Sequence, residues 1–125
     1  MHTDYSDLFH DHLENARNVG KIDNPDGFGE ARTVSCGDVV RITINVRDGV
    51  ITDIKFKAYG CSAAIAGGSL ATEMSKGQRI SDVQKITAEV LAEKFGKIPE
   101  NKISCLDTVV RALQSAIISY HKKLI

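Results

Sequence analysis

The sequence has no excess of either charge, no long apolar run and no low-complexity tract. Its sixteen basic and sixteen acidic residues cancel to a formal net charge of zero. No basic stripe stands out, so we do not expect nucleic acid as a partner. No apolar run approaches the roughly 20 residues that a membrane-spanning helix needs. The first residues lack the charged and then apolar pattern of a secretory signal. We therefore expect a cytoplasmic protein with no segment in a membrane.

Cysteine is scarce as well, and the few cysteines occupy informative places. The chain has three, Cys36, Cys61 and Cys105, an odd number that would leave one thiol outside any disulfide framework. In the cytoplasm thiols stay reduced, and clustered cysteines more often bind metal or react. Each lies at a junction typical of a turn or a helix start, whereas a thiol in mid-element is usually an ordinary small hydrophobic group. Scattered structural cysteines are the alternative.

The chain length of 125 residues suits one domain, over residues 1–125, with a single core. Alternating apolar and polar residues predict two strands, over 40–47 and 53–58, joined by a tight turn at Asp48-Gly49. A third strand is expected over 30–34. Residues 19–30 are rich in turn-forming types, which favours a loop. These segments predict a small three-stranded antiparallel sheet.

Helical spacing of apolar residues predicts the second half of the fold. The main helices are expected over 4–15, 63–74 and 106–120, with two short helices that begin at Ser81 and Thr87. Gly67-Gly68 costs the second main helix about 1 kcal/mol per glycine relative to alanine, which we explain by close packing against another backbone. Because most strands precede most helices, the pattern favours an α+β fold, with the sheet packed against a cluster of helices.

The residues around the three cysteines predict a metal site. In Cys36-Gly37-Asp38 the glycine permits a positive φ, so both flanking side chains can point toward one centre. Cys61 and Cys105 lie near predicted helix N-termini, where free N–H groups and the helix dipole favour a thiolate. Three thiolates and one carboxylate make a four-ligand set.

This ligand set fits more than one metal. Thiolates suit zinc, Cu(I) and iron–sulfur clusters. Three cysteines and Asp38 can close a tetrahedral zinc site, or hold a [2Fe–2S] cluster with Asp38 in place of the usual fourth cysteine. A carboxylate is a harder and weaker ligand for iron than a thiolate, so a cluster held in this way is labile. Lability suits a protein that carries a cluster and passes it on. The residues alone do not decide between a zinc ion and a [2Fe–2S] cluster.

Further stretches, in order along nearly the whole chain, carry a family pattern. They are Asp11-His12 with Asn15, Arg17-Asn18-Val19-Gly20, Cys36-Gly37-Asp38, Phe56 to Ala66, and Lys102-Ile103 with Cys105. This pattern resembles the U-type iron–sulfur cluster assembly scaffolds, which are IscU and the N-terminal domain of NifU. The resemblance implies an α+β fold with a three-stranded sheet. It also implies a scaffold rather than an enzyme, with Cys36, Asp38, Cys61 and Cys105 as cluster ligands.

The resemblance implies partners and a cargo. Sulfur is expected from a cysteine desulfurase of the IscS or NifS type, and Cys105 matches the family's main persulfide acceptor. A [2Fe–2S] cluster is then assembled with Fe²⁺ and transferred to acceptor apoproteins. The sequence does not decide whether the resting protein holds Zn²⁺. It also does not decide whether the cluster is bound by one chain or bridges a homodimer. The alternatives are a zinc-bearing sulfur acceptor of the SufU type and a structural zinc domain. SufU proteins carry an insertion between the second and third cysteines that this chain lacks.

Two departures from the family pattern affect the expected site. The family usually has His before the third cysteine, as an alternative metal ligand, but here Ser104 stands there. We interpret Ser104 as the N-cap of the last helix, with Asp107 as its capping partner, which leaves Asp38 as the obvious fourth ligand. Lys102 either balances the negative charge of the site or is simply solvated. The Leu-Pro-Pro-Val-Lys stretch that docks a dedicated Hsp70 chaperone is reduced here to one proline and Lys102, so the pattern does not carry that partner over.

Overall fold

The computed structural model describes residues 5–33 and 37–124. Its sheet has three antiparallel strands in the order β1 (Gly27–Thr33), β2 (Asp38–Arg47) and β3 (Val50–Tyr59). This confirms the predicted sheet and the turn at Asp48-Gly49, where both residues have positive φ. The loop predicted for residues 19–30 is wrong in its last part, since β1 begins at Gly27. Residues 27–30 pair with β2, and this long-range pairing outweighs their turn-rich composition.

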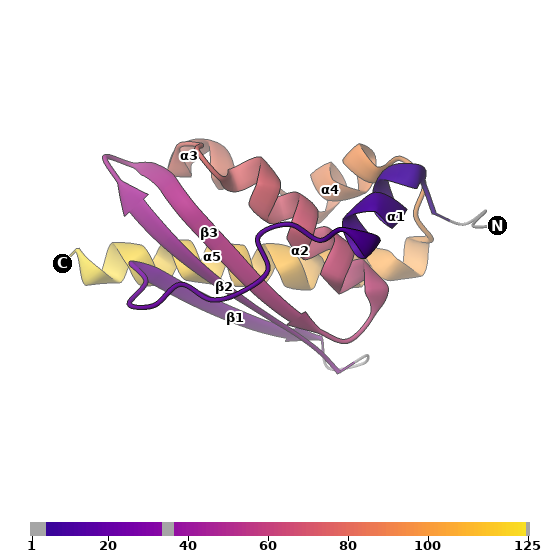
Figure 1. Ribbon diagram of the computed structural model, residues 1–125, viewed down its shortest axis with the longest axis horizontal. Coiled ribbons are helices and arrows are strands. Elements are labelled where there is room, and N and C mark those ends of the chain that lie inside the picture. Colours follow the sequence, from indigo (N-terminus) through magenta and orange to yellow (C-terminus); the bar gives the residue numbers. More distant parts are fainter. Residues whose placement is uncertain (1–4, 34–36, 125) are drawn as a thin grey trace.

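Helices cover one face of this sheet, as the α+β prediction required. They are α1 (Asp7–Glu14), α2 (Ser62–Ser75), α3 (Ile80–Val83), α4 (Ala88–Phe95), the 3₁₀ turn η1 (Glu100–Lys102) and α5 (Ile103–Lys123). The long helix α5 packs on β1 and β2, whereas α2 packs on β3 and against α5. In Figure 1, α1 and α4 lie together at one end of the molecule. The C-terminal end of α5 lies at the other end.

The helix starts show where local sequence signals succeed. Thr87 is the N-cap of α4, and its hydroxyl accepts a hydrogen bond from the Val90 N–H at 3.2 Å, as predicted. Ser81 was expected to cap α3, but this expectation is wrong. The N-cap is Arg79, two residues earlier, and it makes no side-chain capping hydrogen bond. The Ile80 N–H is instead bonded to the Gly49 carbonyl at 2.9 Å, so a tertiary contact fixes the start of the helix.

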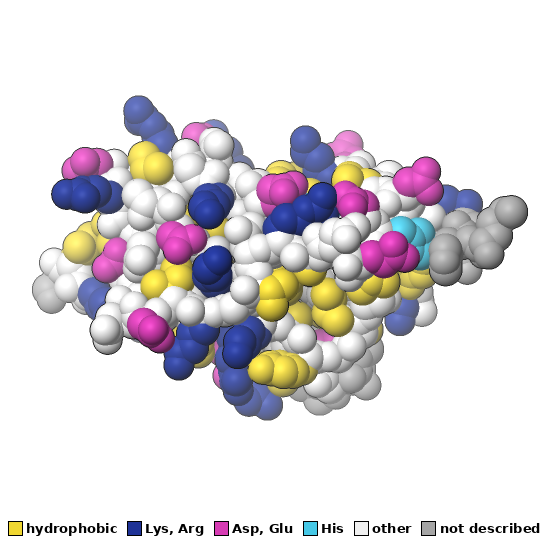
Figure 2. Space-filling view, in the orientation of Figure 1, with side chains coloured by type: hydrophobic (Ala, Val, Ile, Leu, Met, Phe, Trp, Pro, Cys, Tyr) yellow, Lys and Arg dark blue, Asp and Glu magenta, His cyan; other side chains and the backbone are white. Residues whose placement is uncertain are grey.

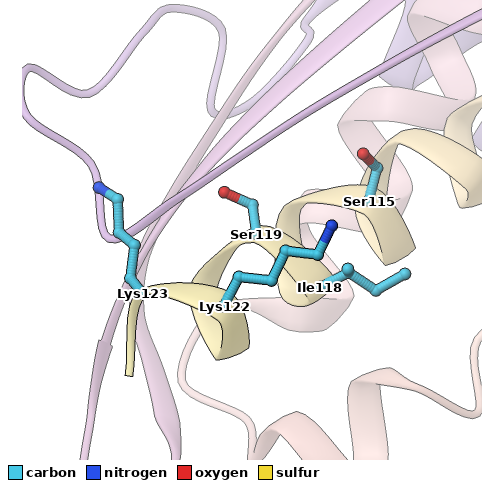
Figure 3. A pocket seen from close by; sticks show the side chains of 5 residues that line it. All are labelled: Ser115, Ile118, Ser119, Lys122 and Lys123. Atoms are coloured by element: carbon cyan, nitrogen blue, oxygen red, sulfur yellow. The ribbon is translucent and has the colours of Figure 1, made fainter. Parts of the chain in front are cut away.

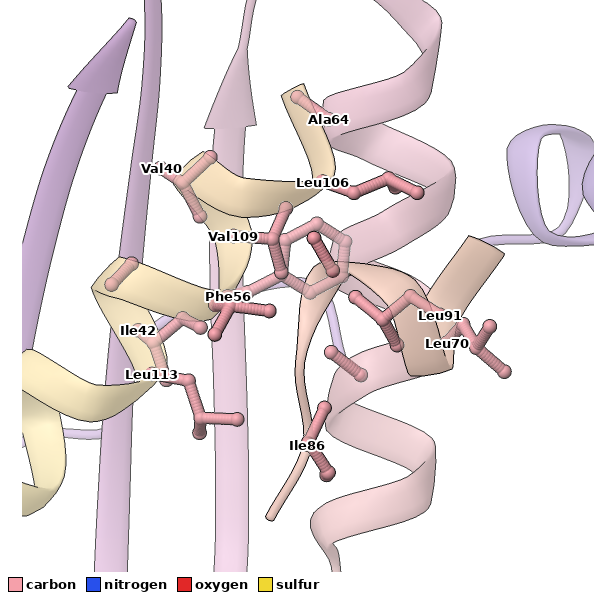
Figure 4. Packing of buried hydrophobic residues seen from close by; sticks show 14 of the residues in the cluster. Val40, Ile42, Phe56, Ala64, Leu70, Ile86, Leu91, Leu106, Val109 and Leu113 are labelled. Atoms are coloured by element: carbon pink, nitrogen blue, oxygen red, sulfur yellow. The ribbon is translucent and has the colours of Figure 1, made fainter. Parts of the chain in front are cut away.

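The core lies between the sheet and the helices. Figure 4 shows side chains from β2, β3, α2, α4 and α5 that meet there, among them Ile42, Phe56, Leu70, Leu91, Leu106 and Leu113. The two glycines of α2 are part of this packing. A Cβ on Gly67 would lie 2.7 Å from Leu106 Cδ2, and one on Gly68 would overlap the ring of Phe56. The expected close packing is therefore present, but the neighbours are core side chains rather than a backbone.

The segment between α1 and β1 crosses the face of the sheet opposite the helices (Figure 1). Its first part follows the outer edge of β3, where the Phe56 N–H donates to the Asn18 carbonyl at 2.8 Å and the Gly20 N–H donates to the Phe56 carbonyl at 2.9 Å. Further along, the Ile22 N–H donates to Thr43 Oγ1 at 3.0 Å. The segment therefore covers part of an edge strand that would otherwise expose unpaired backbone groups.

The surface reflects the equal numbers of basic and acidic residues, and the helices reflect the lack of a long apolar run. Basic and acidic side chains are interspersed over the face seen in Figure 2. Among the residues that the structure describes, none of the helices combines the length and the apolar character needed to cross a membrane.

Candidate metal centre

Three of the four predicted ligands lie together in one group. Asp38 is the first residue of β2, Cys61 is the N-cap of α2, and Cys105 lies in the first turn of α5. One carboxylate oxygen and the two sulfurs all lie within 4.8 Å of one another. Cys61 Sγ is 2.9 Å from Cys105 Sγ and 3.4 Å from Asp38 Oδ2. Cys36 lies outside the described residues, so its membership of the group stays a prediction.

The hairpin that leads into β2 positions Asp38. Asp38 is paired with Thr33 across β1 and β2, and the Gly37 N–H donates to the Thr33 carbonyl at 2.8 Å. Gly37 has a φ of 72°, the left-handed conformation that the sequence predicted. From this position Asp38 Oδ1 accepts the Cys61 N–H at 2.8 Å. The carboxylate thus satisfies the N-cap backbone N–H of α2, as the acid of a capping box does.

Gly60 is a functional residue that the sequence reasoning missed, because it was quoted only as part of a motif. Its φ is 134°, and a Cβ at this position would overlap Asp38 Oδ1. Only a glycine lets the chain turn from β3 into α2 while Asp38 lies against the Cys61 N–H. The available signal was a glycine directly before a candidate ligand, at a strand-to-helix junction.

Asp38 is fully buried, yet it is held in its ionised form. Burial acts to raise the pKa of Asp38, but the hydrogen bond from the Cys61 N–H and the contacts with the thiols of Cys105 and Cys61 outweigh it. The positive charge of Lys102 acts in the same direction. The pKa of Asp38 therefore lies below its ordinary value, and at neutral pH the group offers a carboxylate ready to bind a cation.

Cys105 behaves differently from the expectation based on its helix position. The residue is fully buried, and burial raises the pKa of its thiol, with further increases from the neighbouring Cys61 and Asp38. The expected stabilisation of the thiolate by the helix N-terminus is therefore outweighed, and the thiol is protonated at neutral pH. A cation bound among these atoms compensates the negative charge and favours the thiolate instead.

The two accessory candidates have different outcomes. Lys102 is the half-buried residue that precedes α5. Its charge acts on Asp38, which agrees with a charge-balancing role. Ser104 is an exposed residue within α5 and does not cap it, because η1 runs directly into the helix and moves its start to Ile103. Asp107 was expected to be a capping acid, but it pairs with Arg111 at 3.1 Å.

A set of polar contacts joins α5 to the end of β1, close to the site. Arg111 Nη2 donates to the Arg32 carbonyl at 3.0 Å and lies 3.3 Å from Thr108 Oγ1. The hydroxyls of Thr33 and Thr108 are also in contact. These contacts fix the helix that carries Cys105 against the strand that precedes the Cys36 segment. The residues involved are far apart in the chain, so local sequence patterns gave no signal for them.

A serine, a histidine and a glutamate also meet, between α1 and α2. His12 Nδ1 is 2.7 Å from Ser69 Oγ, and its Nε2 is 3.9 Å from Glu73 Oε1. This contact superficially resembles a hydrolytic triad. However, Ser69 is fully buried, and Arg17 Nη1 donates to the same His12 nitrogen at 3.2 Å. The set therefore joins two helices and leaves no nucleophile within reach of a substrate.

A surface cavity of about 380 Å³ lies near the C-terminal end of α5. Figure 3 shows its lining, which consists of Ser115, Ile118, Ser119, Lys122 and Lys123. At a rise of 1.5 Å per residue, even Ser115 lies about 15 Å along the helix from Cys105. The lining contains no thiol and no carboxylate, so this cavity adds nothing to the ligand group.

Comparison with known proteins agrees with this arrangement. The NifU-like N-terminal domain family matches residues 4–125. The chain belongs to this family. It is 47% identical over 119 residues to the iron–sulfur cluster assembly scaffold protein IscU 1 of Archaeoglobus fulgidus, an alignment that covers 95% of the chain and 78% of that protein. It is 45% identical over 124 residues to IscU of Azotobacter vinelandii, over 95% of the chain and 96% of that protein.

A solved structure shows the same fold as this NifU-like chain. It is the crystal structure of a protein from Fervidobacterium islandicum that is described as a candidate iron–sulfur cluster assembly scaffold for the SUF system. The TM-score is 0.75, and the match covers 93% of this chain and 98% of that one. At 24% sequence identity, this similarity bears on the fold alone. Together with the family match, it confirms the expected IscU/NifU-type α+β fold.

Proposed function

We propose that this NifU-like chain is a scaffold on which a [2Fe–2S] cluster is assembled and from which it is passed to acceptor apoproteins. The observation that carries the proposal is the convergence of Asp38, Cys61 and Cys105, from three separate elements, within 4.8 Å of one another. Membership of a family whose relatives are named as scaffolds supports it. The cluster is cargo in this proposal and is not a permanent part of the protein.

The ligand types account for both binding and release. Cys61 and Cys105 supply soft thiolates for iron, and Cys36 is the proposed third thiolate. Asp38 supplies a hard carboxylate that is already ionised, so it can bind iron before the Cys105 thiol loses its proton. Because a carboxylate binds iron less tightly than a thiolate, the Asp38 position is the point at which an acceptor's own ligand can enter.

Sulfur is proposed to arrive as a persulfide from a cysteine desulfurase, with Cys105 as the acceptor. Cys105 has no exposed surface in this conformation. Delivery therefore requires the first turn of α5, together with η1, to move away from Cys61. Such local opening has ample precedent in elements at the periphery of a fold.

Anaerobic reconstitution tests the scaffold proposal. The reduced protein is incubated with ferrous iron, cysteine and a desulfurase, and iron, sulfide and visible absorbance are measured. We expect a chromophore with about two irons and two sulfides per cluster. Asp38→Asn is expected to change the rate at which the cluster is loaded or released. Asp107 is a surface acid in α5, and Asp107→Asn is the matched control, which is expected to leave both rates unchanged.

The same preparation separates the alternatives. Tightly held zinc that neither exchanges for iron nor accepts sulfur would replace the scaffold proposal with a structural zinc site. Zinc that leaves when one thiol accepts sulfur, with no cluster formed, would instead favour the zinc-bearing sulfur acceptor.

A further inference from the structure

The two described thiols of the site form a pair of their own. Cys61 and Cys105 are both free, and their sulfurs lie 2.9 Å apart. A disulfide bond is about 2.05 Å long, so the sulfurs need to approach by less than about 1 Å to join. Cys61 is partly exposed at the N-cap of α2, whereas Cys105 is buried behind it. This contact is much closer than two ligands of one metal ion require.

We propose that, given the scaffold function above, Cys61 and Cys105 act as a dithiol that converts the delivered sulfur into sulfide. The outer sulfur of a persulfide is at the oxidation level of elemental sulfur. A cluster contains sulfide, which carries two more electrons. A scaffold supplied with persulfide therefore needs a two-electron donor, and a neighbouring thiol is such a donor.

The reaction balances within the pair. The Cys61 sulfur attacks Cys105 Sγ of the Cys105 persulfide, and a bond forms between Cys61 Sγ and Cys105 Sγ. The bond between Cys105 Sγ and the outer sulfur breaks, and the outer sulfur leaves with that electron pair. It departs as H₂S with the proton of the Cys61 thiol and its own proton. The outer sulfur is reduced by two electrons, and the two cysteine sulfurs are oxidised to the disulfide. A dithiol reductant then restores both thiols by exchange.

The geometry favours this pair for two reasons. The new bond joins the two atoms that already lie 2.9 Å apart, and it joins the same two atoms if Cys61 rather than Cys105 carries the sulfur. The sulfide is also released beside Asp38, whose Oδ2 is 3.4 Å from Cys61 Sγ. The carboxylate remains free to hold iron while the two thiols are joined, so sulfide forms where iron can capture it.

A single-turnover experiment without iron tests the proposal. The reduced, metal-free protein is loaded with sulfur by a desulfurase and cysteine, and small thiols are then removed. We expect one H₂S for each disulfide formed, with peptide mapping that links Cys61 to Cys105. In Cys61→Ser the persulfide persists and H₂S release falls about tenfold or more. Serine is a favourable N-cap residue, so this variant is expected to fold, which circular dichroism checks.

Cys36→Ser supplies the discriminating comparison, since it removes one thiol and leaves the pair intact. Continued H₂S release with the Cys61–Cys105 disulfide supports the proposal. Release that is lost in Cys36→Ser but retained in Cys61→Ser overturns it, as does the absence of the disulfide in the unmodified protein. A separate experiment incubates the reduced protein with ferrous iron and inorganic sulfide, so that no persulfide has to be reduced. A cluster formed from them sustains the scaffold function even if the dithiol step fails, whereas failure in this experiment counts against the scaffold itself.

Discussion

Among single residues, Asp38 combines two roles that are usually divided. Its Oδ1 accepts the backbone N–H of Cys61, and its Oδ2 faces the sulfur of the same residue. The first contact fixes the start of α2, and the second places the carboxylate beside the other members of the proposed ligand group. Gly60 leaves the space that both contacts of Asp38 need, because a Cβ at this position would overlap Asp38 Oδ1. The turn from β3, the start of α2 and the proposed metal site therefore all depend on the Asp38 side chain.

Asp38→Ala is expected to slow the release of a bound cluster. The substitution removes the hard, exchangeable ligand of the proposed site. An external thiol then binds the open position on iron, or the remaining ligands rearrange to hold the cluster more tightly. Either change slows release. The decay of visible absorbance after a chelator is added measures the release rate. Asp107→Ala serves as the control. Faster loss from Asp38→Ala than from the unmodified protein would contradict this account.

Gly60→Ala is expected to destabilise the protein by about 3 kcal/mol, near the upper end of the range for a strained backbone position, and to weaken zinc binding. The new methyl group meets Asp38, and alanine is strained at a φ of 134°. Gly77→Ala is the matched control, because its φ is 81° and nothing lies within 4 Å of the added Cβ. Its expected cost is about 1–2 kcal/mol, from backbone strain alone. Urea unfolding measures the free energy of unfolding of both variants. Equal losses of stability would show that the protein accommodates the new methyl group beside Asp38 at no cost.

At the level of elements, α1 is attached to α2 through a buried histidine. Ser69 Oγ in α2 accepts the Arg17 N–H at 2.9 Å and lies 2.7 Å from His12 Nδ1. Arg17 can only donate, so His12 Nδ1 must accept, and the ring is neutral with its proton on Nε2. The attachment of α1 therefore depends on an uncharged imidazole.

This attachment predicts a stability that falls in mild acid. Burial lowers the pKa of His12, and the charge of Arg17 lowers it further, against weaker opposing effects of Glu73 and Asp11. The unfolded chain therefore binds a proton more readily than the folded one, and stability is lost as the pH falls below the unfolded value of about 6.5. Urea unfolding between neutral pH and pH 5 measures the loss. His12→Gln should flatten the pH dependence, whereas the exposed His121→Gln should leave it unchanged.

The helix starts allow a paired test of capping. Thr87→Ala removes the hydroxyl that accepts the Val90 N–H and should cost about 1 kcal/mol of unfolding free energy. Ser104→Ala should change stability by no more than about 0.5 kcal/mol, because Ser104 is exposed and does not cap α5. Thermal unfolding of the two variants measures the difference. A loss in Ser104→Ala as large as in Thr87→Ala would restore the capping role predicted from the sequence.

For the whole molecule, the parts that the sequence predicts are those encoded locally. Alternating residues identified β2 and β3, and Asp48-Gly49 identified their turn, because both signals act between near neighbours. The start of β1 at Gly27 was missed because it depends on pairing with β2. The start of α5 at Ile103 was missed because η1 runs directly into the helix. The motifs selected three residues, Asp38, Cys61 and Cys105, that the structure brings together, but the burial of Cys105 follows from how α5 packs on the sheet.

Metal binding should stabilise the entire fold, because the ligand atoms come from β2, α2 and α5. A ligand that binds only the folded state adds about 2.7 kcal/mol at a hundredfold excess over its dissociation constant. We expect Zn²⁺ to raise the midpoint of thermal unfolding, with a smaller rise in Cys61→Ser. An unchanged midpoint in the unmodified protein would mean that the three groups do not bind one ion together.

The position of Cys105 in α5 also bears on synthesis. A nascent chain emerges with Asp38 and Cys61 first, whereas Cys105 follows 44 positions after Cys61, on the same helix that covers β1 and β2. Until that helix docks, the emerging polypeptide has neither the third described member of the proposed ligand group nor a covered sheet. If the chain assembles a cluster as proposed, we therefore expect loading with iron and sulfur to begin only after α5 has been translated and has docked.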